Sequence, residues 1–247
     1  MNDYVTRTLN AYNAHPEKYE AATASMTPYP EIDDFMALLP SKDLPVLDAG
    51  CGFGRDTAKF AEQGFKAIGI DMSDGLLKRA KELYPDIEFH KMDVRKLDFD
   101  DSNISGIWCH ATLLHLRNND MQKALNEFKR VLILGGVVFI SLKEGTGEEE
   151  FVEKFSSDSA RYFKYQTIET TTKLIEASGL SIVKIYTINE REKWGPDKRN
   201  LNWVYCFARK PIGPKDDPDF TEAVKLMAST SPISNEEIIK RSKKRKG

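Results

Sequence analysis

Between residues 45 and 143, short apolar runs alternate with longer stretches in which apolar residues recur every three or four positions. The runs are typical of buried strands, and the stretches are typical of amphipathic helices. Strands that alternate with helices in this way build a parallel sheet with helices on both faces. We therefore expect strands at residues 45–50, 66–72, 87–94, 105–114 and 136–143, with helices over 55–64, 73–85 and 118–132.

The alternation continues toward the C-terminus. A Gly-Gly turn is expected just before the strand at 136–143, and a loop rich in glycine and glutamate is expected after it, at 145–150. A final set of elements closes the series: a helix over 167–179 and strands at 180–189 and 201–210.

The two ends of the chain differ from this central pattern. Residues 1–40 hold helical stretches punctuated by aromatic side chains, and we expect them to form a helical cap or lid. Residues 41–210 are expected to form the main domain. Residues 211–247 form a C-terminal extension that is rich in proline and charge and ends in a basic tail.

Composition excludes several classes of function. The chain has 247 residues, a formal net charge of -2 and 40% hydrophobic residues, so it has no overall attraction to nucleic acid or anionic lipid. Its N-terminus does not resemble a signal peptide and no stretch is long enough to span a bilayer, so a cytoplasmic location is expected. The cysteines at 51, 109 and 206 are far apart, and "HATLLH" lacks metal-binding spacing, so no metal site is expected.

The first strand ends in the glycine-rich stretch "VLDAGCGFGRD", from Val46 to Asp56. Glycines at alternate positions between a strand and a helix allow a ligand to approach the main chain, and the helix start favours an anionic group. Asp71 ends the next strand, where a carboxylate can bind the two hydroxyls of a ribose. The dinucleotide fingerprint would need glycine at position 55, where this chain has Arg55, so a smaller anion is favoured.

The ordered motifs resemble the class I S-adenosylmethionine-dependent methyltransferases, and most closely their small-molecule branch. The resemblance is carried by "VLDAGCGFGRDTAKFAEQGFKAIGIDMSDGLLKRAKE", "FHKMDVRKLDFDDSNISGIWCHATLLHL" and "EFKRVLILGGVVFISLKEG", and it covers roughly residues 10 to 210. It implies a Rossmann-like α/β fold with a seven-stranded, mostly parallel sheet in the order 3-2-1-4-5-7-6, in which strand 7 is antiparallel and helices cover both faces.

The resemblance also implies which residues bind the cofactor, S-adenosyl-L-methionine. The glycine loop would hold its methionine part, Asp71 its ribose hydroxyls and Met72 its adenine ring. The acidic position after the third strand would accept the adenine amino group, and the end of the fourth strand would approach the sulfonium. The residues concerned are Asp48, Gly50, Cys51, Gly52, Gly54, Asp71, Met72, Asp93, Val94 and His110.

Four of these positions have a structural alternative, which for His110 is ordinary packing or hydrogen bonding. Asp71 could instead cap the helix that begins at residue 73. Asp93 could be a turn residue, and Met72 could belong to the hydrophobic core.

The methyl group of a sulfonium is already activated, so transfer to an N or O nucleophile needs alignment and, where the acceptor carries a proton, a base. His115 and Glu144 are the catalytic candidates, because both are expected at the carboxyl ends of strands, where open α/β sheets bind ligands. Ordinary packing or hydrogen bonding is the alternative for each.

The segment "RYFKYQ", residues 161–166, lies where the resemblance places acceptor-binding residues. A guanidinium can bind a carboxylate or phosphate through two hydrogen bonds, and aromatic rings can wall an apolar substrate. With the N-terminal tyrosines, this segment predicts a lid over a small molecule that bears an anionic or aromatic group. The candidate substrate-binding residues are Tyr12, Tyr19, Arg161, Phe163 and Tyr165; simple packing of the aromatic residues is the alternative.

Other partners and functions remain open at this point. A methyltransferase of RNA or protein would share the cofactor residues, and the tail "KRSKKRKG" could contact nucleic acid, although a solvated terminus is favoured. An NAD(P)-binding oxidoreductase would share the sheet and Asp71. The sequence does not determine the oligomeric state.

Overall fold

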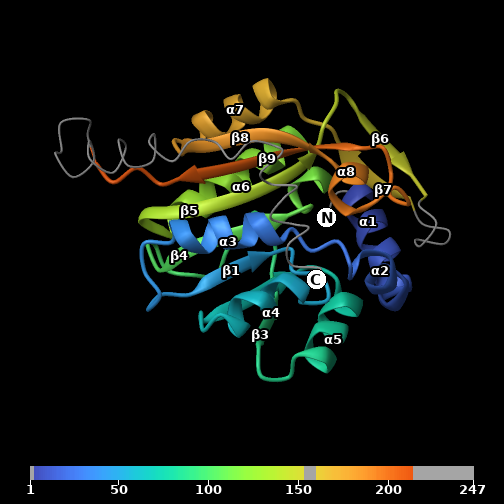
Figure 1. The fold of residues 1–247 in the computed structure, drawn as a ribbon, viewed down its shortest axis with the longest axis horizontal. Helices are drawn as coiled ribbons and strands as arrows, with labels where there is room; N and C mark the ends of the chain where they lie inside the picture. Colours follow the sequence, from blue (N-terminus) through green and yellow to red (C-terminus); the bar gives the residue numbers. More distant parts are fainter. Residues whose placement is uncertain (1–2, 153–159, 214–247) are drawn as a thin grey trace.

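Seven strands form one central sheet in the computed structural model, which describes residues 3–152 and 160–213 (Figure 1). Its order is β3-β2-β1-β4-β5-β9-β8, and β9 runs antiparallel to both of its neighbours. The strand order and the antiparallel direction expected from the sequence are confirmed. The strands are β1 Val46–Ala49, β2 Ala67–Asp71, β3 Glu88–Lys91, β4 Ile104–His110, β5 Leu132–Lys143, β8 Ser181–Asn189 and β9 Asn202–Arg209.

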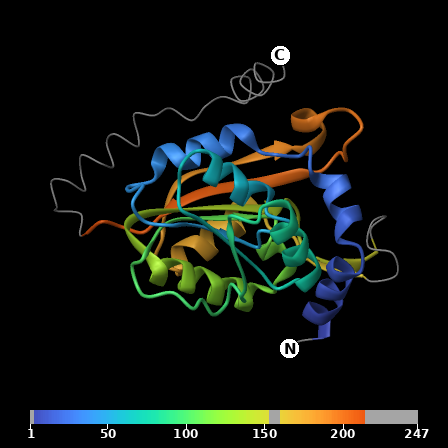
Figure 2. The same cartoon turned by 90° about the horizontal axis from the view of Figure 1, so that it is seen from below.

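Helices cover both faces of the sheet. Figure 2 shows α3 (Tyr29–Leu38) and α4 (Arg55–Glu62) on one side, with α6 (Asn118–Val131) and α7 (Ile168–Ala177) on the other. The connection after β2 forms α5 (Asp74–Leu83). This arrangement leaves the carboxyl ends of the parallel strands free of these covering helices, and such ends are where α/β sheets bind ligands.

Aromatic side chains fill the core beneath α3 and α4. Trp108 on β4 is fully buried and stacks on Phe139 of β5 with 4.0 Å between ring centroids. Phe35 of α3 and Phe60 of α4 pack against the same indole. Because Phe35 belongs to this core, α3 packs as a sheet-covering helix, although it falls within residues 1–40.

Helices α1 (Asp3–Ala14) and α2 (Pro16–Thr23) lie across the end of the sheet, beside α5 (Figures 1 and 2). Asn13 anchors α1, because its side-chain oxygen accepts hydrogen bonds from the Ser73 hydroxyl at 2.7 Å and from the Gly75 amide at 3.0 Å. Glu20 anchors α2 through an ion pair with Arg79 of α5. These contacts hold the N-terminal helices over the strand ends.

The structure corrects the expected loop at residues 145–150. Its second half forms β6 (Glu148–Phe151), which pairs antiparallel with β7 (Arg161–Lys164) in a separate two-stranded sheet. The sequence did not predict this hairpin, because three consecutive glutamates give β6 no alternation of apolar and polar residues. The segment 161–166 is therefore partly a strand and not a loop.

Two strand boundaries also differ from the expected ones. Strand β5 begins at Leu132, so the two glycines lie within it as an irregularity in the register with β4 and not as a turn before it. Gly135 has a φ of +75°, a conformation that glycine adopts readily at a bulge in a strand. Strand β4 ends at His110, and the chain then forms a short 3-10 helix, η1 (Leu113–His115).

The remaining described element is α8 (Glu190–Trp194), between β8 and β9. Across the described residues, no helix is both long enough and apolar enough to cross a bilayer. The C-terminal extension from residue 214 onward, including the basic tail, lies outside the described residues.

Candidate functional site

The glycine loop at the end of β1 requires glycine for steric and conformational reasons. Gly50 has a φ of +85°, and a Cβ built on it would lie 2.1 Å from the hydroxyl oxygen of Thr112. Gly54 has a φ of +84° and precedes the first residue of α4, and its Cβ would lie 2.7 Å from the ring of Phe89. The main chain of the loop therefore packs closely against Thr112, which follows β4, and against Phe89 of β3. Glycine lets a ligand approach its other side.

Asp71 connects this loop to the end of β2. Its carboxylate accepts hydrogen bonds from the Gly52 amide at 2.9 Å and from the Ser73 amide at 2.8 Å. The cap of α5 is Ser73, whose hydroxyl accepts from the amide of Leu76 at 3.2 Å, so Asp71 is not the capping residue. Burial raises the pKa of Asp71 above its usual range.

A cavity opens beside Asp71, at the ends of β2 and β3. We call it the β2–β3 chamber. Asp93 lines it, with its carboxylate held by the Arg95 guanidinium at 2.6 Å and by the Arg95 amide at 2.9 Å. The other predicted cofactor residues in its wall are Gly50, Gly52, Met72, Val94 and His110.

A second cavity lies at the ends of β4 and β5, and we call it the β4–β5 chamber. Its wall combines cationic, acidic and aromatic side chains. The predicted residues that line only this chamber are Asp48, Cys51, Arg161 and Phe163. Trp194, Arg199 and Trp203, for which the sequence allows either acceptor binding or packing, also line it, and the structure adds Phe53, Arg55, Asp56 and Lys143.

The two chambers share a boundary. Tyr12 and Tyr19 line both of them, and so do His110 and His115. The two tyrosine rings meet edge to face with 5.1 Å between centroids. Two ligands bound in the separate chambers would therefore meet beneath α1 and α2.

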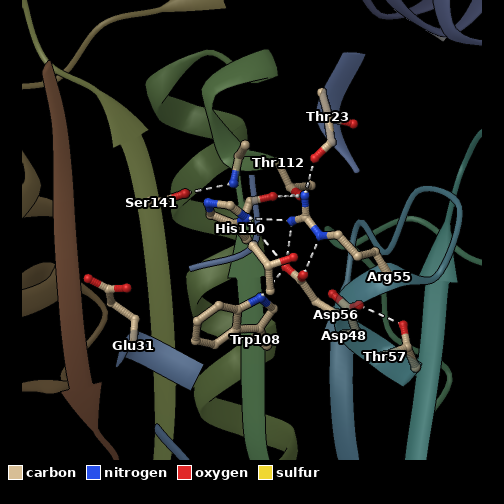
Figure 3. Close-up of polar contacts among 12 residues, drawn as sticks. Thr23, Glu31, Asp48, Arg55, Asp56, Thr57, Trp108, His110, Thr112 and Ser141 are labelled. Atoms are coloured by element: carbon tan, nitrogen blue, oxygen red, sulfur yellow. Dashed lines mark hydrogen bonds and ion pairs between the residues drawn. The ribbon is translucent and has the colours of Figure 1, made fainter. Parts of the chain in front are cut away.

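A buried network of polar groups forms one wall of the β4–β5 chamber (Figure 3). The Arg55 guanidinium binds the Asp56 carboxylate at 2.6 and 3.0 Å and donates to the Thr23 carbonyl of α2 at 2.8 Å. Asp56 also accepts from the indole nitrogen of Trp108 at 3.0 Å and lies 3.4 Å from Nδ1 of His110. The network thus joins the glycine loop, β4 and the N-terminal helices.

Two carboxylates of this wall have opposite ionisation behaviour. Burial and the neighbouring charge of Asp56 raise the pKa of Asp48 to about 8, against a hydrogen bond that it accepts from Thr57 at 2.6 Å. Burial also opposes the charge of Asp56, but Arg55 and His110 outweigh it and hold the pKa of Asp56 well below its usual range. At neutral pH Asp56 carries the negative charge, and Asp48 holds a proton when no ligand cation is near.

His115 lies in a chain of hydrogen bonds that closes the lid. Its Nδ1 lies 2.7 Å from the Tyr162 carbonyl, which can only accept, so Nδ1 carries the proton. Its Nε2 accepts from the Tyr12 hydroxyl at 2.8 Å, and that oxygen accepts from Arg161 at 2.6 Å. Burial and the charge of Arg161 lower the pKa of His115 to about 3, so the imidazole is neutral.

Three predicted residues line neither chamber. Glu144 forms an isolated bridge with Gln166 and is half-buried, and Tyr165 packs against Gly145 with its hydroxyl bonded to Glu149. Gly54 shapes the loop without lining a cavity.

Sequence reasoning missed Lys143 and the pair formed by Arg55 and Asp56. The sequence does contain an indication that Lys143 is a site residue. It directly follows the apolar run "VVFISL" of a central strand, where a lysine is rarely buried.

Comparisons with known proteins agree with this geometry. A family described as a methyltransferase domain matches residues 46–136. A ubiquinone/menaquinone biosynthesis C-methyltransferase of Campylobacter jejuni is 34% identical over 113 residues, which are 42% of this chain and 47% of that protein. A malonyl-[acyl-carrier protein] O-methyltransferase of Salmonella typhimurium is 33% identical over 123 residues, 46% of this chain and 45% of that protein. The chain thus spans about half the length of these relatives.

Solved structures resemble the chain over a longer stretch. The 1,6-didemethyltoxoflavin-N1-methyltransferase of Burkholderia thailandensis, solved with S-adenosylhomocysteine, has a TM-score of 0.67 at 22% identity and covers 85% of this chain and 89% of its own. A methyltransferase from Methanosarcina mazei has a TM-score of 0.64 at 18% identity and covers 75% of this chain and 99% of its own. Residues 46–136 therefore match a methyltransferase domain, and the chain has the fold of the class I S-adenosylmethionine-dependent methyltransferases, as the motifs indicated.

Proposed function

We propose that this protein transfers a methyl group from S-adenosylmethionine to an N or O nucleophile of a small molecule. One observation carries the proposal: two chambers with different walls meet at Tyr12, Tyr19 and His110 beneath the N-terminal helices. The β2–β3 chamber has the groups that suit an adenosine, and the β4–β5 chamber has the groups that suit a polar acceptor.

The residues of the β2–β3 chamber and the glycine loop fit the cofactor. Asp71 has lone pairs for ribose hydroxyls beyond the two amides that it accepts, since a carboxylate offers about four acceptor sites. Met72 and Val94 supply apolar surface for a base, and Asp93 supplies an acceptor near its edge. Asp48 and Asp56 place acidic groups on the β4–β5 side of the loop, where they would attract the ammonium group. When bound, the cofactor supplies a methyl group activated by the positive charge on sulfur.

The β4–β5 chamber favours a small acceptor with an anionic or aromatic part. Arg161 contributes its guanidinium, and Phe163, Trp194 and Trp203 contribute aromatic surface. The chamber is covered by α1, α2 and the β6–β7 hairpin, and α1 is bonded to the hairpin through Tyr12, His115 and Arg161. A lid of this kind excludes water and aligns a small nucleophile, whereas a folded polymer would need an open surface.

Calorimetry tests cofactor binding directly. We expect S-adenosylmethionine and S-adenosylhomocysteine to bind without added metal, and we expect NADH to bind far more weakly. Tight NADH binding with no heat from either sulfur compound would support an oxidoreductase and refute the proposal.

A screen for cofactor turnover against a metabolite library tests the acceptor class. Small acidic or aromatic compounds should release S-adenosylhomocysteine, and total RNA or protein extract should not. If RNA is the better acceptor, a variant that lacks residues 240–247 shows whether the basic tail contributes, because loss of phosphate contacts reduces the salt dependence of binding.

A further inference from the structure

Lys143 is a buried lysine at the end of a central strand. It is the last residue of β5, where it pairs with Trp203 of β9, and its side chain is 3% exposed. The residue is also among those that line the β4–β5 chamber. A lysine rarely occupies such a position, because burial removes water from its charge.

Cationic and aromatic groups surround the Lys143 amine. Its nitrogen lies 3.4 Å from the ring centroid of Phe163, and the Arg161 guanidinium lies 5.1 Å from the same centroid. Arg199, in the segment after α8, adds a second guanidinium, which is bonded to Glu190 at 2.8 Å. Among the described residues, Glu190 of α8 and Glu149 of β6 are the acidic groups whose charges act on Lys143.

Burial and the two guanidiniums oppose a positive charge on Lys143. Burial, with repulsion from Arg199 and Arg161, outweighs the attraction of Glu190 and Glu149 and lowers the pKa of Lys143 to about 7. A substantial share of the protein therefore holds a neutral amine at neutral pH. A neutral amine in a cavity is a base, and proton transfer is efficient when the pKa of the base is near the working pH.

We propose that Lys143 accepts the proton of the methyl acceptor, and that this acceptor is a small aromatic or enolic compound with an acidic O–H or N–H group. The inference rests on the proposed function and deepens it. An anion in the chamber would be stabilised by the new ammonium of Lys143 and by Arg161, while the rings of Phe163 and Trp203 would contact its planar part.

Proton transfer and methyl transfer each break one bond and form one bond. The acceptor O–H or N–H bond breaks, and its proton moves to the lone pair of the Lys143 amine, which becomes an ammonium. The electron pair left on oxygen or nitrogen forms a bond to the methyl carbon. The bond between that carbon and sulfur breaks with its electron pair on sulfur, which gives the neutral thioether. The ammonium returns its proton to solvent when the methylated product leaves.

The two catalytic candidates from the sequence are less suited to this proton transfer. Both ring nitrogens of His115 are already bonded within the protein, and its pKa of about 3 makes it a weak base. Glu144 lies outside both chambers. His115 is better suited to position Tyr12 over the junction of the chambers.

Nuclear magnetic resonance of lysine side chains tests the titration without any acceptor. The full chain, saturated with S-adenosylhomocysteine, is labelled with ¹³C and ¹⁵N in lysine, and Lys143→Met assigns the signal. We expect the Lys143 signal to titrate about three pH units below the ordinary lysine value. A Lys143 midpoint near that ordinary value would overturn the inference.

Methyl transfer to a series of nitro- and halogen-substituted phenols of graded acidity tests the chemistry. The wild type and the control Lys173→Met should share a kcat/KM profile that rises with pH through the Lys143 midpoint. Lys143→Met should lose that rise, and its rate should follow the fraction of phenol already ionised. Thermal unfolding of each variant shows that the fold is retained.

The variant Lys143→Arg tests whether Lys143 acts as a base or only as a fixed positive charge. Arginine keeps the positive charge but does not accept a proton at these pH values, so we expect it to lose turnover of the weakly acidic phenols and keep the strongly acidic ones. Full activity of Lys143→Arg on every phenol would overturn the role as a base. If the protein uses other acceptors but no phenol in the series, the acceptor class is wrong. Failure to bind S-adenosylhomocysteine would instead overturn the proposed function.

Discussion

Replacement of Asp71 by asparagine should weaken cofactor binding and the glycine loop together. The carboxylate accepts the amides of Gly52 and Ser73 at 2.9 and 2.8 Å, from the two segments that border the β2–β3 chamber. Asparagine keeps one acceptor oxygen and introduces an NH₂ group, so one of the two amides loses its partner. Leaving a partly buried donor unpaired costs roughly 1–3 kcal/mol of folding stability.

The same substitution removes the charged acceptor proposed for the ribose hydroxyls. A hydrogen bond to a charged group contributes roughly 1.5–3 kcal/mol, so the Kd for S-adenosylhomocysteine should rise by roughly 10- to 150-fold. Calorimetry measures the Kd, and urea unfolding measures the stability. The bound ligand should also protect the variant less from unfolding than it protects the wild type.

Asp74→Asn is the matched control. Asp74 lies three residues away, and its exposed side chain pairs with Lys91 at the surface. Such pairs contribute roughly 0–1 kcal/mol, so neither the stability nor the Kd should change much. If Asp71→Asn behaves like this control in both measurements, the carboxylate neither holds the loop nor binds the cofactor, and the reasoning is refuted.

Three further substitutions test the core, the lid and the buried acids. Trp108→Ala should cost roughly 3–5 kcal/mol in urea unfolding, because it removes the indole that stacks on Phe139; a loss below 1 kcal/mol would contradict this. Tyr12→Phe leaves His115 without its Nε2 partner, so amide exchange in α1 should accelerate and stability should fall by roughly 1–3 kcal/mol; unchanged exchange would show that this bond does not hold the lid. Asp48→Asn should flatten the pH dependence of stability. Between the usual carboxyl pKa near 4 and the folded value of about 8, native Asp48 keeps a proton that the unfolded chain has lost, so rising pH destabilises the wild type by up to roughly 1.4 kcal/mol per pH unit relative to the variant. Parallel pH curves for the two proteins would refute the raised pKa.

The sequence predicted the sheet and the cofactor side well because the signals there are local. The glycines and Asp71 end strands at the same edge of a parallel sheet, so their positions in the sequence determine their positions in space. The helix-cap alternative for Asp71 depended on one residue, and the structure assigns that cap to Ser73. The β6–β7 hairpin escaped prediction because its two strands depend on each other and on α1, and its glutamates have no apolar periodicity.

The acceptor side was harder to predict because its chemistry arises from tertiary contacts. Arg161 approaches Lys143 only because the hairpin folds back over the end of β5, and this proximity helps to lower the pKa of Lys143. His115 was a catalytic candidate for its place after a strand, yet the carbonyl of Tyr162, 47 residues away, fixes which nitrogen carries its proton. A histidine in the short helix after β4 and a lysine at the end of β5 therefore acquire opposite suitability as bases. His115 has its lone pair bonded to Tyr12 of the lid and a pKa of about 3. Lys143 has an amine in the chamber wall that titrates near neutral pH.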